Sequence, residues 1–137
     1  MNAVDTNVLI YACDGRDGSK QDTAMRLLRT MPDGVMLWQV AAEFIAASRK
    51  LEAQGFRSSD AWGRLGDLLA RFPLARPSQR TLEIAQPLHV EQGLAFWDAM
   101  IIASCIEVGV TTLYSEDVPG AKVEGVHVLN PFAASGT

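Results

Sequence analysis

Four acidic residues of the chain lie beside apolar runs and have no basic residue three or four positions away: Asp5, Glu43, Asp98 and Asp117. Grouping several ionised carboxylates near a hydrophobic core is unfavourable unless a cation, a proton or hydrogen bonds offset their repulsion. Hard divalent cations such as Mg²⁺ and Mn²⁺ prefer oxygen ligands and share their coordination shell with phosphate oxygens. The sequence therefore predicts that these four carboxylates converge on a metal ion.

Each of these acids also has an ordinary structural explanation. Asp5 could cap the helix that follows it, which stabilises a helix by about 1 kcal/mol. Asp98 lies in a first helical turn, where the helix dipole favours negative charge. Glu43 could reach water from the rim of an apolar stripe, and Asp117 could form a turn. Glu116 is an alternative to Asp117, because adjacent residues of an extended segment point to opposite faces.

Alternating strand and helix patterns indicate how the acids are positioned. Short apolar or β-branched runs predict strands at residues 2–5, 35–38, 72–75, 111–114 and 126–129. Helical periodicity and capping residues predict helices at residues 6–12, 19–31, 39–54, 58–71, 78–92 and 97–108, the fifth kinked or broken near Pro87. Gly55 and Gly109 lie where two of these helices should end.

This alternation predicts an α/β fold with a central parallel sheet of about five short strands and helices on both faces. Sites in such sheets form at the carboxyl ends of strands. Asp5 and Asp117 lie at predicted strand ends, whereas Glu43 and Asp98 lie on flanking helices. The four acids are therefore expected to meet at one edge of the sheet.

The length of 137 residues suits one domain spanning residues 1–137. Cys13 and Cys105 lie inside apolar segments, which favours buried, reduced thiols over a disulfide. The N-terminus lacks a basic region, and no apolar run approaches the roughly 20 residues that a membrane span needs. These features lead us to expect a cytoplasmic protein.

The net charge of -4 argues at first against a nucleic-acid partner, because phosphate contacts come mainly from Lys and Arg. Without the four unpaired acids, however, 12 of the 16 acidic residues remain and balance the 12 basic ones. The net charge therefore neither excludes nor supports a nucleic-acid partner. Basic residues near loops or near the Glu43 helix are candidate phosphate contacts: Arg16, Lys20, Arg49, Lys50 and Lys122.

Four sequence blocks, in order, make the chain resemble the PIN-domain ribonucleases, specifically the VapC-type toxins of type II toxin–antitoxin pairs. The blocks are Val4–Tyr11, Gln39–Phe44, Phe96–Ala103 and Ser115–Asp117, the last followed by Leu129–Phe132. The resemblance spans nearly the whole chain. It maps the acidic quartet of the family onto Asp5, Glu43, Asp98 and Asp117, and its supporting polar positions onto Asn7 and Ser115.

The resemblance implies a metal-dependent endoribonuclease that uses Mg²⁺ or Mn²⁺. In that case Asp5, Asp98 and Asp117 would bind the metal, with Glu43 as a further ligand directly or through water. It also implies a homodimer, RNA as the substrate, and a cognate antitoxin whose C-terminal segment covers the early helices.

A second function class is a non-catalytic α/β domain with an acidic pocket, either a receiver-like domain or an inactive PIN interaction module. Receivers need a lysine near the pocket, and the only late candidate is Lys122, which lies in a predicted loop. A phosphatase of the haloacid-dehalogenase type is disfavoured, because it needs a second aspartate where this chain has Asn7.

Overall fold

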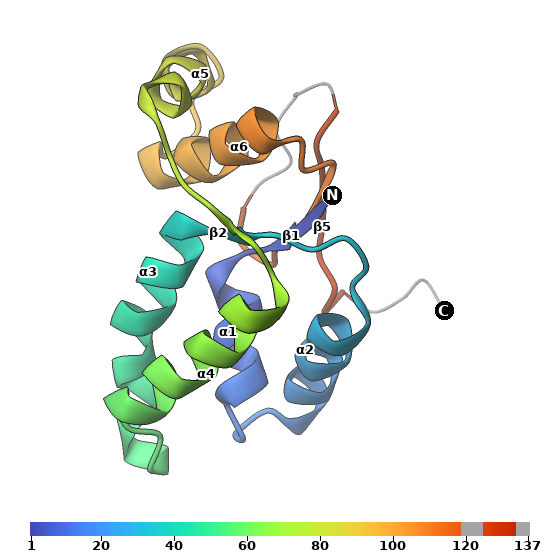
Figure 1. Cartoon of the computed structure of the whole chain (residues 1–137), viewed down its shortest axis with the longest axis vertical. Coiled ribbons are helices and arrows are strands. Elements are labelled where there is room, and N and C mark those ends of the chain that lie inside the picture. Colours follow the sequence, from blue (N-terminus) through green and yellow to red (C-terminus); the bar gives the residue numbers. More distant parts are fainter. Residues whose placement is uncertain (119–124, 134–137) are drawn as a thin grey trace.

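Short strands lie between two groups of helices in the computed structural model, which describes residues 1–118 and 125–133 (Figure 1). The strands are β1 (Asn2–Val4), β2 (Met36–Leu37), β3 (Leu74–Ala75), β4 (Thr112–Tyr114) and β5 (His127–Leu129). The α-helices are α1 (Thr6–Cys13), α2 (Gly18–Thr30), α3 (Trp38–Ala47), α4 (Ser58–Arg71), α5 (Gln79–Val90) and α6 (Phe96–Val108). A 3-10 helix, η1 (Ser48–Gln54), continues α3.

All strand pairs are parallel, as predicted, but the central sheet is smaller than predicted. It has three strands in the order β1-β4-β5, and β2 and β3 form a separate pair. A single bridge between Asn2 and Gly34 joins the two. The physical reason is the length of β2: α3 begins at Trp38, directly after Leu37, so few residues remain to pair with β1.

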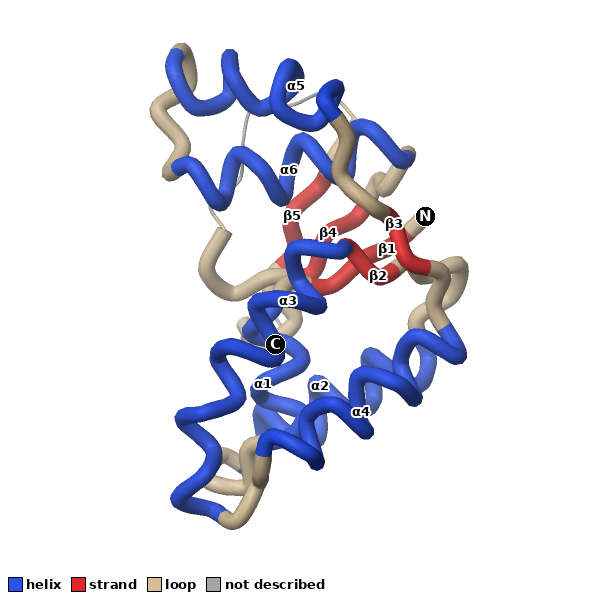
Figure 2. Tube along the Cα trace, turned by 60° about the vertical axis from the view of Figure 1, so that its left-hand side comes forward, coloured by secondary structure: helices blue, strands red, loops and turns tan. Residues whose placement is uncertain are grey.

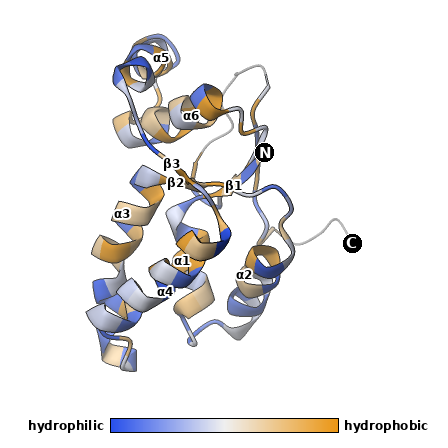
Figure 3. Ribbon diagram, viewed as in Figure 1, coloured by the Kyte–Doolittle hydropathy of each residue, from blue (hydrophilic) through white to orange (hydrophobic). Residues whose placement is uncertain are grey.

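Helices cover both faces of the strands, which confirms the predicted layers. Figures 1 and 2 show α5 and α6 on one side and α1 to α4 on the other. Helix α6 is apolar on most sides, and Ala99, Ile102 and Cys105 are fully buried. Helix α2 instead has a hydrophilic and a hydrophobic side (Figure 3) and buries only Ala24 completely. The core thus lies between the sheet and α1, α3 and α6.

Several helix ends match the sequence prediction. Gly55 and Gly109 follow η1 and α6 with φ angles of 83° and 84°, a left-handed conformation that glycine adopts without steric cost. Of the two alternatives predicted at Pro87, a kink or a break, the break is wrong, because α5 continues to Val90. Pro87 lies in the last turn, where its missing N–H removes one hydrogen bond, and the adjacent Leu88 is buried.

Gly34 lies where the two strand groups meet, and its lack of a side chain is required by packing. A Cβ atom there would lie 2.6 Å from two ring atoms of Phe72 and 2.8 Å from the Met31 methyl group. We expect Gly34→Ala to lower the free energy of unfolding by about 1 to 3 kcal/mol, the usual cost of overpacking. Gly63→Ala in α4, where nothing lies within 4 Å of the new atom, should instead stabilise by about 0.5 to 1 kcal/mol. Urea unfolding measures both, and equal effects would contradict this packing argument.

Candidate active site

The four predicted acids, Asp5, Glu43, Asp98 and Asp117, all line one cavity of about 230 Å³, which we call the acidic cavity. It opens where β1 and β4 end, between α1, α3 and α6. Its other lining residues are Thr6, Asn7, Ile10, Ala47, Lys50, Trp97 and Ile101. Side chains more than 110 residues apart in the sequence therefore meet at the carboxyl edge of the parallel sheet.

Asp5 is held at the end of β1 by hydrogen bonds to both carboxylate oxygens. Its Oδ1 accepts the backbone N–H of Thr6 at 2.7 Å, and its Oδ2 accepts the hydroxyl of Ser115 at 2.8 Å. Its own backbone N–H donates to the Tyr114 carbonyl at 2.8 Å, which joins the ends of β1 and β4. The helix-cap explanation for Asp5 and its place in the cavity are thus both correct, because the two oxygens have different partners.

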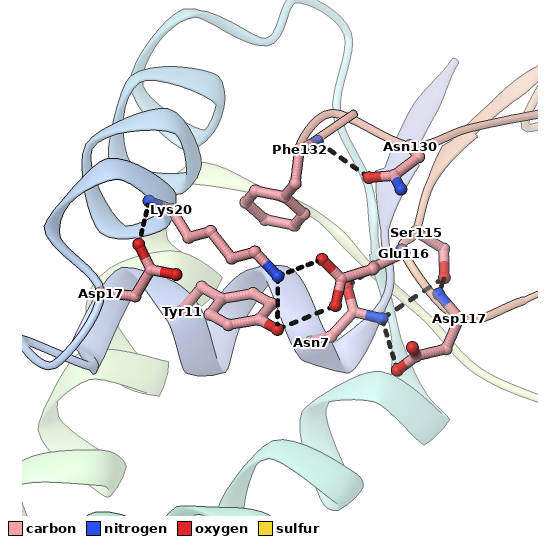
Figure 4. Close-up of polar contacts among 9 residues, drawn as sticks. All are labelled: Asn7, Tyr11, Asp17, Lys20, Ser115, Glu116, Asp117, Asn130 and Phe132. Carbon is pink, nitrogen blue, oxygen red and sulfur yellow. Dashed lines mark hydrogen bonds and ion pairs between the residues drawn. The ribbon is translucent and has the colours of Figure 1, made fainter. Parts of the chain in front are cut away.

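Asn7 and Ser115 connect the two strand ends. The Asn7 side-chain amide donates to Asp117 Oδ2 at 3.2 Å and lies 3.4 Å from Asp5 Oδ2. The Ser115 hydroxyl accepts the backbone N–H groups of Asp117 and Val118 at 3.2 and 3.0 Å. These two polar residues, which the sequence analysis named as supporting, therefore fix the turn that carries Asp117 (Figure 4).

Glu43 is oriented by Gln39, one helical turn earlier on α3. The Gln39 Nε2 donates to Glu43 Oε1 at 2.7 Å and to the backbone carbonyl of Trp97 at 3.2 Å. It therefore ties Glu43 to the first turn of α6, next to Asp98. Sequence reasoning assigned no role to Gln39 or Trp97. Two features of the sequence could have pointed to them. Gln39 is a polar residue within the apolar pattern of α3, and Trp97 is an aromatic residue directly before Asp98.

Three of the four acids have raised pKa values. Burial is the largest cause for Asp5, Glu43 and Asp98. Repulsion adds to it, since Asp117 raises the pKa of both Asp5 and Asp98. Asp5 and Asp98 in turn raise the pKa of Glu43. The carboxylates therefore repel one another across the cavity, and a bound cation would relieve this repulsion.

Glu116 points away from the acidic cavity, so the acid that enters it is Asp117. Glu116 accepts hydrogen bonds from the Tyr11 hydroxyl at 2.8 Å and from the Lys20 ammonium at 2.6 Å (Figure 4). The Lys20 contact, followed by that from Tyr11, lowers the pKa of Glu116. The Lys20 ammonium also lies 4.5 Å from the centre of the Tyr11 ring, and the Phe132 ring packs against that ring edge-on at 4.8 Å.

The predicted phosphate contacts have different surroundings. Lys20 is bound to Glu116, and Arg16 forms a two-bond ion pair with Asp14 at 2.9 and 3.0 Å. Neither is available as a free cation, because nearby acids neutralise both. Lys50 lines the acidic cavity and Arg49 is exposed. The last candidate, Lys122, lies outside the described residues.

The donor set of the acidic cavity suits a hard cation. Its charged ligating groups are carboxylates, and within residues 1–118 and 125–133 no His or Cys lines it. Among the described residues, no group of three or more His, Cys, Asp or Glu side chains is arranged to hold a metal ion by itself. Magnesium usually keeps several of its waters and needs only one or two direct carboxylates, so the residues present are compatible with it.

The fold and the cavity define an α/β protein with an acidic site at the carboxyl edge of a parallel sheet. The PIN domain family model matches residues 3–123 of the sequence. The chain belongs to the PIN-domain family. No curated protein sequence matches the chain, and no helix in residues 1–118 and 125–133 is both long and apolar enough to cross a bilayer.

Solved structures share this fold. A toxin–antitoxin complex from Klebsiella pneumoniae has a chain 22% identical with a TM-score of 0.71, covering 96% of this chain and 98% of that one. VapC20 from Mycobacterium tuberculosis, a sarcin-ricin loop cleaving toxin, is 20% identical with a TM-score of 0.66, covering 85% and 90%. VapBC2 from Rickettsia felis, bound to a promoter DNA fragment, is 17% identical with a TM-score of 0.65, covering 93% and 96%. Together with the family, these similarities support a nuclease in general terms.

The raised pKa of Asp98 gives a pH-dependent prediction for the metal-free protein. A carboxyl group whose pKa is higher in the folded than in the unfolded state stabilises the fold at low pH, and this contribution is lost as the pH rises through the raised value. We therefore expect Asp98→Asn to be more stable than the wild type at pH 7, by up to about 1 kcal/mol because solvent screens a partly exposed group.

This difference should shrink as the pH falls toward the ordinary aspartate value, where the wild-type carboxyl also becomes neutral. Urea unfolding in EDTA at several pH values measures it. A variant that is less stable than the wild type at pH 7, or a difference that is independent of pH, would contradict mutual repulsion in the cavity.

Proposed function

We propose that this chain is a metal-dependent endoribonuclease that acts as the toxin of a toxin–antitoxin pair. The observation that carries the proposal is that all four acids line one cavity in a PIN domain. Structural similarity to VapC20, described as a sarcin-ricin loop cleaving toxin, supports RNA as the substrate class. Membership in the PIN-domain family leaves an inactive PIN interaction module as the remaining alternative.

Asp5, Asp98 and Asp117 would bind one or two Mg²⁺ or Mn²⁺ ions, with Glu43 as a further ligand directly or through water. When bound, such an ion supplies an activated water molecule and neutralises charge on a phosphate group. Asp5 presents a carboxylate already oriented by Thr6 and Ser115.

Polar residues that contact acids of the cavity have positioning roles. Asn7 holds Asp117, and Gln39 holds Glu43, so their carboxylates need little reorganisation when a metal enters. Lys50 is the basic residue that lines the cavity. Its ammonium group can attract the RNA phosphate to a site that otherwise carries negative charge.

The reaction products test the mechanism. Attack by water rather than by the ribose 2′-hydroxyl should give 5′-phosphate and 3′-hydroxyl ends, and excess EDTA should stop cleavage. Asp98→Ala should lower kcat at least about a hundredfold, as expected when a group that stabilises transition-state charge is lost. Asp67→Ala, which removes an exposed acid of α4 outside the cavity, is the matched control and should cleave normally.

End-group analysis of the cleaved RNA and single-turnover rates provide the measurements. Products with 2′,3′-cyclic phosphate, or cleavage that persists in EDTA, would exclude this mechanism. If purified protein binds RNA without cleaving it under any divalent cation, the inactive interaction module is the correct function.

We also propose a cognate antitoxin as protein partner, supported by the structural similarity to toxin–antitoxin complexes. An apolar groove of about 380 Å³ lies between α3 and α4 and is suited to the apolar face of a partner helix. Its lining residues are Trp38, Ala41, Ala42, Ile45, Trp62, Leu65, Leu69 and Leu74. The homodimer implied by the sequence resemblance stays a prediction that sedimentation can test.

Leu69→Asp should weaken antitoxin binding at least about tenfold, because it places a charge in an apolar contact. Ribonuclease activity of the free variant should stay unchanged, since Leu69 does not line the acidic cavity. Leu82→Asp on α5, an equally drastic change at an exposed leucine outside the groove, is the control. Calorimetry with the candidate antitoxin, the product of any small reading frame found next to this gene, measures the affinity. If both variants lose the same amount of affinity for the antitoxin, the groove between α3 and α4 is not its binding site.

A further inference from the structure

A second hollow of about 330 Å³ adjoins the acidic cavity. We call it the indole slot, and its lining residues are Trp38, Gln39, Ala42, Glu43, Ala46 and Trp97. Glu43 and Trp97 line both the slot and the acidic cavity. The two hollows therefore lie side by side, and a strand whose phosphate lies in the cavity can place a neighbouring nucleotide at the slot.

The indole slot combines two indole rings with small side chains. Trp38, Ala42 and Ala46 follow one another at four-residue spacing, so they form one strip along α3. Trp97 comes from the first turn of α6. Both rings are largely open to solvent, with 49% of Trp38 and 61% of Trp97 exposed. The two alanines leave the space beside the rings free for a flat ligand.

Trp97 is held in place although its ring is exposed. Its backbone carbonyl accepts the hydrogen bond from Gln39, and its ring packs edge-on against Phe96 at 4.9 Å. A large aromatic surface that is already positioned loses little conformational entropy when a ligand stacks on it. The same Gln39 amide also holds Glu43, so the backbone that carries the ring is tied to a carboxylate of the cavity.

The charges favour a nucleobase as the occupant. RNA binding usually relies on Lys and Arg, yet Lys20 and Arg16 are bound to acids and Lys50 lines the cavity itself. With two of the candidate phosphate contacts paired to acids and a net charge of -4, we expect part of the RNA affinity to come from uncharged contacts. Stacking of unpaired bases on aromatic rings provides such contacts, and tryptophan offers the largest ring for it.

We propose that the indole slot binds an unpaired nucleobase of the RNA substrate, adjacent to the phosphodiester group in the acidic cavity, by stacking on Trp97. This inference rests on the proposed ribonuclease function. It favours RNA that is single-stranded at the cleavage position, because moving a paired base out of its stack into the slot costs the free energy of unpairing and unstacking.

Steady-state cleavage of a single-stranded RNA decamer tests this proposal. Trp97→Ala should raise KM about tenfold and change kcat less than about twofold, and Trp97→Tyr should retain most of the affinity. The control is Leu82→Ala, because Leu82 is also a large apolar side chain, 54% exposed, but lies outside both the slot and the apolar groove between α3 and α4. A decamer without the base next to the cleavage site should also raise the wild-type KM about tenfold, with no further rise in Trp97→Ala.

The proposal would be overturned if Trp97→Ala and the missing base raised KM independently of each other. It would also be overturned if Trp97→Ala changed kcat alone, because Trp97 would then be a positioning residue for Asp98. If Trp97→Ala weakens antitoxin binding but leaves KM for the decamer unchanged, the slot belongs to the protein partner and the proposal is rejected.

A fluorescence measurement separates this inference from the ribonuclease proposal. With Trp97 as the sole tryptophan, in a Trp38→Phe and Trp62→Phe background, the decamer should quench its emission in EDTA, and the decamer without that base should quench it less. Quenching without cleavage in Mg²⁺ would reject the ribonuclease and keep the slot. Cleavage without quenching would reject the slot and keep the ribonuclease.

Discussion

Repulsion among the carboxylates at the ends of β1 and β4 is the constraint on which the rest of the site depends. The protein offsets it with neutral donors: the Ser115 hydroxyl, the Asn7 and Gln39 amides and the Thr6 backbone N–H. Within residues 1–118 and 125–133, none of the four acids forms an ion pair with Lys or Arg. The negative charge is therefore oriented but not neutralised, which is the condition under which a divalent cation binds most favourably.

The turn after β4 directs the adjacent acids Glu116 and Asp117 to different sites. Asp117 enters the acidic cavity, whereas Glu116 turns to Lys20 and Tyr11. The ion pair with Lys20 connects this turn to α2, and Phe132 packs on Tyr11 from the end of the described chain. Lys20, which its place near a loop made a candidate phosphate contact, thus stabilises the turn instead. The basic residue that remains at the cavity, Lys50, comes from η1 on the opposite side.

The sequence was most informative where local rules decide the structure. The step from β1 into α1 follows from an apolar run and a capping aspartate, and the ends of η1 and α6 follow from Gly55 and Gly109. It was least informative where distant packing decides. The division of the strands into two groups depends on how few residues of β2 pair with β1 before α3 begins, and α5, which continues through Pro87, packs along α6.

The sequence by itself determined which side chains could bind a metal ion, namely the acids at strand ends and on apolar helices that have no basic residue nearby. It could do so because residue type and the spacing of apolar residues are local properties. Only the tertiary structure decided that these acids line one cavity, that Glu116 is excluded from it, and that Trp97 and Trp38 border an adjoining hollow. The physical reason is sequence separation. Asp5 and Asp117 meet because β1 pairs with β4. Glu43 and Trp97 border the same hollows, where Gln39 of α3 donates a hydrogen bond to each.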